Sequence, residues 1–89
     1  MNEEQKLTLR GGILMQLSAA YPRSLKPGTL LTNLKLVHDF KQLDEDTLDE
    51  HLRYLERKER IERIGSDGGL RNYLITDSGR AWLDEEELI

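Results

Sequence analysis

The chain has no cysteine, only two prolines, and only one tryptophan, three tyrosines and one phenylalanine among its 89 residues. The absence of cysteine excludes disulfide frameworks, thiolate catalysis and cysteine-based zinc sites. No apolar run approaches the ~20 residues that a membrane-spanning helix needs. The polar start of the chain carries acid where a secretion signal is basic. We therefore expect a cytoplasmic protein without a membrane partner.

Positive charge is also scarce, since 13 lysines and arginines stand against 17 aspartates and glutamates, for a formal charge of −4. Nonspecific affinity for a nucleic acid comes mainly from neutralising phosphates, so any basic binding face must be local. The length and the 37% hydrophobic share predict a single domain over residues 1–89. Within it we expect an N-terminal arm at 1–7 and an acidic C-terminal end at 84–89.

A first helix is predicted after Thr8, which is a possible N-cap, and Pro22 ends the run. The apolar residues at helical spacing are Leu9, Ile13, Leu14, Leu17, Ala20 and Tyr21. Gly11 and Gly12 lie near the predicted start, where we expect a frayed first turn or close contact with another backbone. They form no phosphate-binding motif, because no strand precedes them.

A second helix is predicted to open at Pro27, a residue suited to the first helical turn. Its apolar face comprises Leu30, Leu31, Leu34 and Val37. Residues 23–26 form a short connection that could pair as a single strand. After the helix, residues 38–43 predict a turn that keeps Phe40 and Leu43 in the core.

A third helix is predicted after Asp44, a good N-cap, with a buried stripe of Leu48, Leu52 and Leu55. The periodicity then changes to two short apolar segments, 61–64 and 73–75. Between them, residues 65–72 have the glycine, aspartate and serine content of a β-hairpin tip. Thr76 is expected to cap a final helix. The predicted order is helix, helix, helix, hairpin, helix.

The segments 52–58, 61–63 and 73–81 resemble the end of the recognition helix, the wing entry and the wing return of a winged-helix (winged helix-turn-helix) DNA-binding domain. The chain is similar over about residues 9–83 to bacterial regulators of the MarR and PadR type. The resemblance implies an α+β, mainly helical fold with a three-helix core, a β-hairpin wing and a C-terminal helix. The family usually has Gly and then an apolar residue where this chain has Glu59 and Arg60, so the third helix lacks the easy left-handed cap of Gly.

The resemblance implies a bacterial or phage-type transcription regulator that contacts double-stranded DNA through the third helix and the wing. From Arg53 to Arg80, seven basic residues outnumber five acidic ones, in contrast with the whole chain. The candidate DNA-binding residues are Thr47, Arg53, Arg57, Arg60, Arg63, Arg71 and Asn72. Arg71 is the leading candidate, because wing tips in such domains commonly lie along the minor groove or the backbone.

Acidic residues complicate this interpretation. Asp46, Asp49 and Glu50 lie in the N-terminal half of the third helix, which in such domains is nearest the bases. They gain stability from the helix dipole, yet they would meet a polyanion with like charge. The alternative is a protein-interaction module in which this acidic face docks a basic partner.

Charge pairing within the helix is a competing explanation for the arginines. Asp49 with Arg53, Glu56 with Arg60, and Glu59 with Arg63 are each four residues apart, the spacing at which helical side chains meet. Such pairs would neutralise part of the local positive charge. A solvated, self-paired surface therefore stands beside the DNA-binding hypothesis.

No catalytic or metal-binding constellation is present in the sequence, and we expect neither an enzyme nor a cofactor. The two histidines, His38 and His51, stand in no metal or nucleophile motif. We expect His51 to be half-buried beside the leucine stripe and His38 to meet a helix end. Trp82 is expected to pack in the core, or to join a homodimer through the terminal helices.

Overall fold

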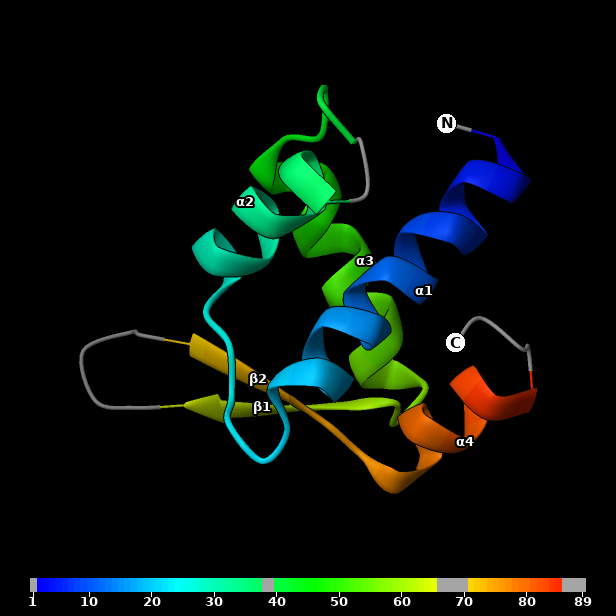
Figure 1. Ribbon diagram of the computed structural model, residues 1–89, viewed down its shortest axis with the longest axis vertical. Helices are drawn as coiled ribbons and strands as arrows, with labels where there is room; N and C mark the ends of the chain where they lie inside the picture. Colours follow the sequence, from blue (N-terminus) through cyan, green and yellow to red (C-terminus); the bar gives the residue numbers. More distant parts are fainter. Residues whose placement is uncertain (1, 38–39, 66–70, 86–89) are drawn as a thin grey trace.

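The computed structural model describes residues 2–37, 40–65 and 71–85. The described chain folds in the predicted order of three helices, a hairpin and a fourth helix. The elements are α1 (Glu3–Ala20), α2 (Pro27–Val37), α3 (Glu45–Arg57), β1 (Ile61–Gly65), β2 (Arg71–Ile75) and α4 (Asp77–Glu85). In Figure 1 the first three helices lie above the hairpin, which projects to the left, and α4 lies at the lower right.

The core fills the space enclosed by the three helices and the base of the hairpin. Its buried apolar residues are Leu9, Ile13, Leu14, Leu17, Leu30, Leu34, Leu43, Leu48, Leu52, Leu55, Ile61, Tyr73, Ile75 and Leu83. The predicted stripe of α3 is confirmed, and Phe40 packs against this core as expected. Val37 does not share the buried face, since it is 68% exposed. That part of the prediction is wrong, because Leu34 is the last residue of α2 buried in the core and the helix continues past it to Val37.

The first helix starts earlier than predicted. Asn2 is its N-cap and forms a capping box with Gln5, in which each side chain accepts a hydrogen bond from the other residue's backbone N–H. Thr8 lies inside the helix, and its hydroxyl donates to the Glu4 carbonyl oxygen. Residues 3–7 are therefore helical rather than an arm. Gly11 and Gly12 are buried in the middle of α1 and do not belong to a frayed first turn.

The connection between α1 and α2 adds a single pairing to the hairpin, as the sequence suggests for residues 23–26. Leu25 and Tyr73 exchange two backbone hydrogen bonds of 2.8 and 2.9 Å. This bridge holds the connection against β2. The start of α2 is thereby placed beside the hairpin.

The hairpin is antiparallel, with Ile61 opposite Ile75 and Gly65 opposite Arg71. The strands are longer than predicted, because Gly65, Arg71 and Asn72 belong to them and not to the loop. The remaining predicted loop residues, 66–70, lie outside the described residues, as do His38 and residues 86–89. Of the predicted acidic end, Asp84 and Glu85 belong to α4.

The third helix ends in a left-handed turn without glycine. Glu59 has a φ of 60°. Its N–H donates to the Glu56 carbonyl oxygen, and the Arg60 N–H donates to the Leu55 carbonyl oxygen, both at 3.0 Å. These two bonds form a Schellman motif. The helix thus uses the cap that glycine would favour, with a glutamate in the strained position.

The junction between this turn and α4 depends on Thr76 and Gly79. The Thr76 hydroxyl donates to the Glu59 carbonyl oxygen at 2.7 Å and accepts the Gly79 N–H at 3.0 Å, which confirms Thr76 as the cap of the last helix. A Cβ atom on Gly79 would lie 2.2 Å from the Arg60 carbonyl oxygen. Glycine is required here because α4 packs directly on the backbone of the turn.

Candidate nucleic-acid interface

The surface of α3 that faces away from the core divides into two halves of opposite charge. Asp44 caps the helix by accepting the Thr47 N–H at 2.7 Å, and the stripe through Leu48, Leu52 and Leu55 faces the core. At 100° per residue the opposite side carries Asp46, Glu50, Arg53 and Arg57, all of which are exposed. The first half of this face is therefore acidic and the second half is basic.

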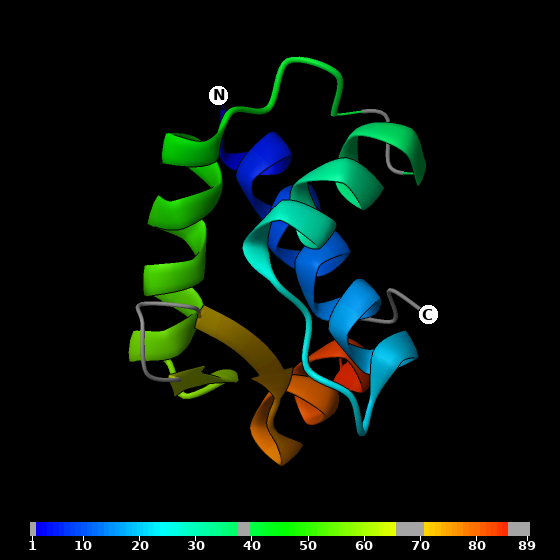
Figure 2. The ribbon, with the colours of Figure 1, turned by 90° about the vertical axis from the view of Figure 1, so that its left-hand side faces the viewer.

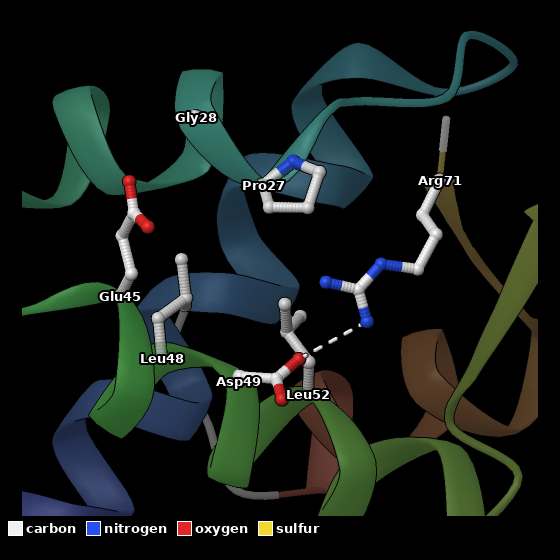
Figure 3. Close-up of a pocket in the computed structure, with 7 residues that line it drawn as sticks. All are labelled: Pro27, Gly28, Glu45, Leu48, Asp49, Leu52 and Arg71. Atoms are coloured by element: carbon white, nitrogen blue, oxygen red, sulfur yellow. Dashed lines mark hydrogen bonds and ion pairs between the residues drawn. The ribbon is translucent and has the colours of Figure 1, made fainter. Parts of the chain in front are cut away.

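Asp49 joins the helix to the hairpin. Its Oδ2 lies 2.9 Å from Arg53 Nη2, and its Oδ1 lies 3.2 Å from Arg71 Nη1. The predicted i, i+4 pair with Arg53 is confirmed. Figure 3 shows Arg71 reaching across a cavity of about 160 Å³ towards Asp49, with Pro27 on one side and Leu48 and Leu52 on the other. One carboxylate thus holds two arginines from different elements on the same side of the molecule.

Side chains alternate between the two faces of the hairpin, and this alternation determines which of its polar residues face α3. Tyr73 and Ile75 are buried on one face of β2, and Arg71 shares that face because successive side chains alternate. Arg63 lies opposite Tyr73 and therefore on the same face. Asn72 lies on the opposite face. Arg71 and Arg63 are brought to α3, and Asn72 is not.

The other predicted helical pairs do not form. Glu56 pairs with Arg63 of the hairpin, at 3.7 Å between Oε2 and Nε. Arg60, a predicted DNA-binding residue, instead stacks over the Trp82 ring of α4 at 5.1 Å and so does not join Arg53 and Arg57 on the outer side of α3. The reason is the left-handed turn at Glu59, which redirects the chain before Arg60.

Thr47 and Arg57, two further predicted site residues, differ in burial and in contacts. Thr47 is partly buried and belongs to the N-cap, whose hydrogen bonds lower the pKa of the Asp44 carboxyl. Arg57 is exposed, and among the described residues it makes no hydrogen bond, ion pair or ring contact. Arg57 is therefore the most available cation on the outer face of α3.

Two basic residues of α1, absent from the predicted site, also lie beside α3. Lys6 and Arg10 line a groove with Arg53 and Arg57 on the far side of α3 from the hairpin. Their four-residue spacing is a signal that they share a helix face. That signal is lost when the helix is assumed to start at Thr8, because Lys6 then falls in the arm.

His51 anchors Arg10 in this groove. It is 5% exposed, so it is buried and not half-buried as predicted. The Arg10 Nε–H donates to His51 Nδ1 at 3.2 Å, and the guanidinium carbon lies 3.7 Å from the centroid of the Tyr54 ring. Burial, followed by the positive charge of Arg10, lowers the pKa of His51. In the hydrogen bond with Arg10, His51 Nδ1 is the acceptor.

Other kinds of site have no support in the described residues. In residues 2–37, 40–65 and 71–85 no group of three or more His, Asp or Glu side chains is placed to hold a metal ion. Within the same ranges, no helix combines the length and apolar character that crossing a membrane requires.

The fold is similar to solved structures of transcription regulators. A PadR family regulator from Clostridium difficile matches with a TM-score of 0.67 and 22% identity, over 88% of this chain and 83% of that one. MepR, which regulates the Staphylococcus aureus multidrug efflux pump MepA, matches with a TM-score of 0.65 and 26% identity, over 90% of this chain and 59% of that one. No protein-family model and no curated protein matches this sequence.

These similarities confirm the predicted architecture. This chain has a winged-helix fold. A MepR variant solved with a bound oligodeoxyribonucleotide also matches, with a TM-score of 0.65 and 26% identity, over 94% of this chain and 67% of that one. The structural neighbours are winged-helix DNA-binding transcription regulators of the PadR and MarR families, and they are not enzymes. In this fold the β1–β2 hairpin is the wing.

Proposed function

We propose that this protein is a small winged-helix transcription regulator, of bacterial or phage type, that binds double-stranded DNA through the C-terminal half of α3 and the wing. One observation carries the proposal: arginines of α3 and of both strands of the hairpin gather at the outer face of α3. They are Arg53, Arg57, Arg63 and Arg71. The neighbour solved with an oligodeoxyribonucleotide supports the same use of the fold. Such a protein would act in the cytoplasm.

The ion pairs of these arginines do not prevent phosphate binding. A guanidinium has five N–H donors, and Asp49 engages Nη2 of Arg53 and Nη1 of Arg71. Pairs between exposed side chains contribute only about 0 to 1 kcal/mol. A phosphate can therefore bind the remaining donors, or replace the carboxylate, at little cost. Arg57 has no carboxylate partner among the described residues that a phosphate would have to replace.

DNA titration tests the proposal directly. The probe is a labelled duplex that the wild-type protein enriches from a random-sequence library, titrated at several salt concentrations. We expect steep weakening with salt, and we expect Arg57→Ala to lower the slope by about one for one lost phosphate contact. Arg23→Ala is the matched control, because Arg23 is exposed in the connection between α1 and α2. Absence of binding to any duplex at low salt would remove the proposal.

The acidic half of α3 supports a second candidate function, a protein-interaction module. Asp46 and Glu50 are exposed, and among the described residues neither makes an ion pair. Asp49 belongs less to this face than the sequence suggests, since two arginines share it. Charge reversal at Asp46 and Glu50 tests this function in a pull-down. The function is favoured if the reversal abolishes capture of a basic partner and leaves the salt dependence of DNA binding unchanged.

We also propose that two copies associate through their terminal helices, because a dimer would read a two-part DNA site. Leu7 of α1 is 45% exposed, and Trp82 of α4 is only partly buried. Sedimentation of the wild-type protein and of Leu7→Glu should show a dimer that the substitution weakens. A wild-type monomer at micromolar concentration would contradict this proposal.

A further inference from the structure

A basic groove runs along the side of α3 that lies away from the wing. The residues that line it are Lys6, Arg10, Glu50, His51, Arg53, Tyr54 and Arg57. Four of these side chains are cationic and one is a carboxylate. The groove is therefore positive, although the whole chain carries a formal charge of −4. Half of its cations come from α1, far from α3 in the sequence.

Arg10 is held in this groove with most of its donors unused. Its Nε–H is taken by His51, and one face of the guanidinium rests on the Tyr54 ring. A guanidinium stacked on a ring keeps the N–H groups of its edge available. The two terminal nitrogens make no hydrogen bond to any described residue. Arg10 is thus a donor fixed in orientation.

Lys6 lies one helical turn before Arg10, on the same face of α1. Its ammonium is 3.5 Å from Glu3, whose side chain is 90% exposed. An exposed pair of this kind contributes only about 0 to 1 kcal/mol and is weakened by salt. Lys6 can leave it for a phosphate.

The two sides of α3 match the two borders of a DNA major groove. That groove is about 12 Å wide and admits one α-helix between two phosphate backbones. In Figure 1, α3 lies between the wing on the left and the N-terminal half of α1 on the right, and in Figure 2 it stands at the left edge of the molecule, where no other helix covers its outer side. Arg63 lines a groove between α3 and the wing, and Lys6 lines the groove between α3 and α1. Arg53 and Arg57 line the grooves on both flanks.

We propose that the groove between α1 and α3, with Arg10 and Lys6 as donors, binds the phosphate backbone on the side of the major groove opposite the wing. This inference rests on the proposed DNA-binding function. It assigns to α1 a role in DNA contact, in addition to its role in the core.

The competing explanation is structural: in it, Arg10 serves only to join α1 to Tyr54 and His51. The two roles give different readouts. A structural arginine affects the unfolding midpoint, whereas a phosphate contact affects the salt dependence of binding and the position of the contacted phosphate. Lys6 separates the two, because its removal leaves the contacts of Tyr54 and His51 in place.

The test titrates Lys6→Ala, Arg10→Gln and Arg10→Lys against the duplex enriched by the wild-type protein. Each of the first two should lower the salt slope by about one, so that raising the salt from about 50 to 200 mM weakens binding ~3.5-fold less than in the wild type. Arg10→Lys should keep the wild-type slope, because it keeps the charge. Arg23→Ala serves as the control for loss of a distant charge.

Ethylation interference on each labelled strand then locates the lost contact. At the site of each bound copy we expect interference in both strands for the wild type, and loss of interference in one of these two strands for Lys6→Ala and Arg10→Gln. Arg63→Ala should remove it from the other strand. Wild-type slopes and interference patterns in both α1 variants, with a reduced slope in Arg57→Ala, would overturn the inference and leave the proposed function standing. Failure of the wild type to bind DNA would overturn both.

Discussion

The two sides of the C-terminal end of α3 are built from different kinds of contact. Towards α4, the backbone carbonyls of Glu59 and Arg60 meet Thr76 and Gly79 at hydrogen-bond and van der Waals distance. On the outer face, Asp49 and the arginines around it are partly or fully exposed and meet through side-chain ends. The junction with α4 therefore maintains the fold, whereas the outer charges can change with little effect on it. Stability and DNA binding should separate when each side is altered.

The largest expected effect is at the junction. Gly79→Ala places a Cβ atom 2.2 Å from the Arg60 carbonyl oxygen and 2.8 Å from Ile75 Cγ1, so α4 or the turn must shift. We expect a loss of about 3 kcal/mol in the free energy of unfolding, measured by urea denaturation. Gly28→Ala is the matched control. A Cβ atom on Gly28 meets nothing within 4 Å, and this variant should be neutral or slightly more stable. Equal stability of both variants would contradict the close contact at Gly79.

The same junction offers a stabilising change. Glu59 adopts a φ of 60°, a conformation that costs a side chain with a Cβ atom about 1 kcal/mol and costs glycine much less. Glu59→Gly should therefore raise the free energy of unfolding by up to about 1 kcal/mol. Its DNA affinity should stay close to that of the wild type, since Glu59 lies at the junction. A destabilised variant would show that the side chain of Glu59 matters more than its backbone.

The contact between α1 and α3 should give a pH-dependent stability. Burial and the charges of Arg10 and Lys6 lower the pKa of His51, and Glu50 opposes them. Because the folded pKa lies below the unfolded value near 6.5, this contribution is complete above pH 6.5 and is lost as the pH falls through the folded pKa. Thermal melting between about pH 7 and 5 should show the loss. His51→Gln should reduce the slope in this window, whereas the loss linked to Asp44 appears only below its unfolded pKa of 3.8.

The smallest effect on stability is expected at the outer face. Asp49→Asn removes pairs whose arginine side chains are 67% and 40% exposed, so the free energy of unfolding should change by less than about 1 kcal/mol. Binding to a duplex of random sequence should tighten at low salt, because a carboxylate beside the phosphates is lost. If binding weakens, Asp49 instead orients Arg53 and Arg71 for DNA.

The fold was largely predictable because its signals are local. The leucine spacing in α3, the N-cap at Asp44 and the hairpin composition each act within a few residues, and the structure agrees with them. The start of α1 was missed because Asn2 and Thr8 are both acceptable caps in sequence, and the capping box with Gln5 decides between them. Val37 was misplaced because periodicity shows which face of a helix is apolar and does not show where the core ends.

The candidate site was only partly predictable. Periodicity placed Arg53 and Arg57 on the outside of α3, and the alternation of β2 was available to place Arg71 towards it. The partners of Arg71 and Arg63 could not be predicted, because Asp49 with Arg71 and Glu56 with Arg63 join different elements. Arg60 leaves the group through a left-handed turn that a glutamate rarely adopts.

The amino-acid order alone determined the sequence of helices and strands and the apolar faces they bury, because these follow from backbone geometry and from the removal of apolar side chains from water. The tertiary structure alone decided which polar side chains of different elements meet. Arg10 reaches His51 and Arg71 reaches Asp49 only when elements 41 and 22 residues apart pack together. Coulombic attraction depends on distance in space, and the distances that matter here do not exist before the chain folds.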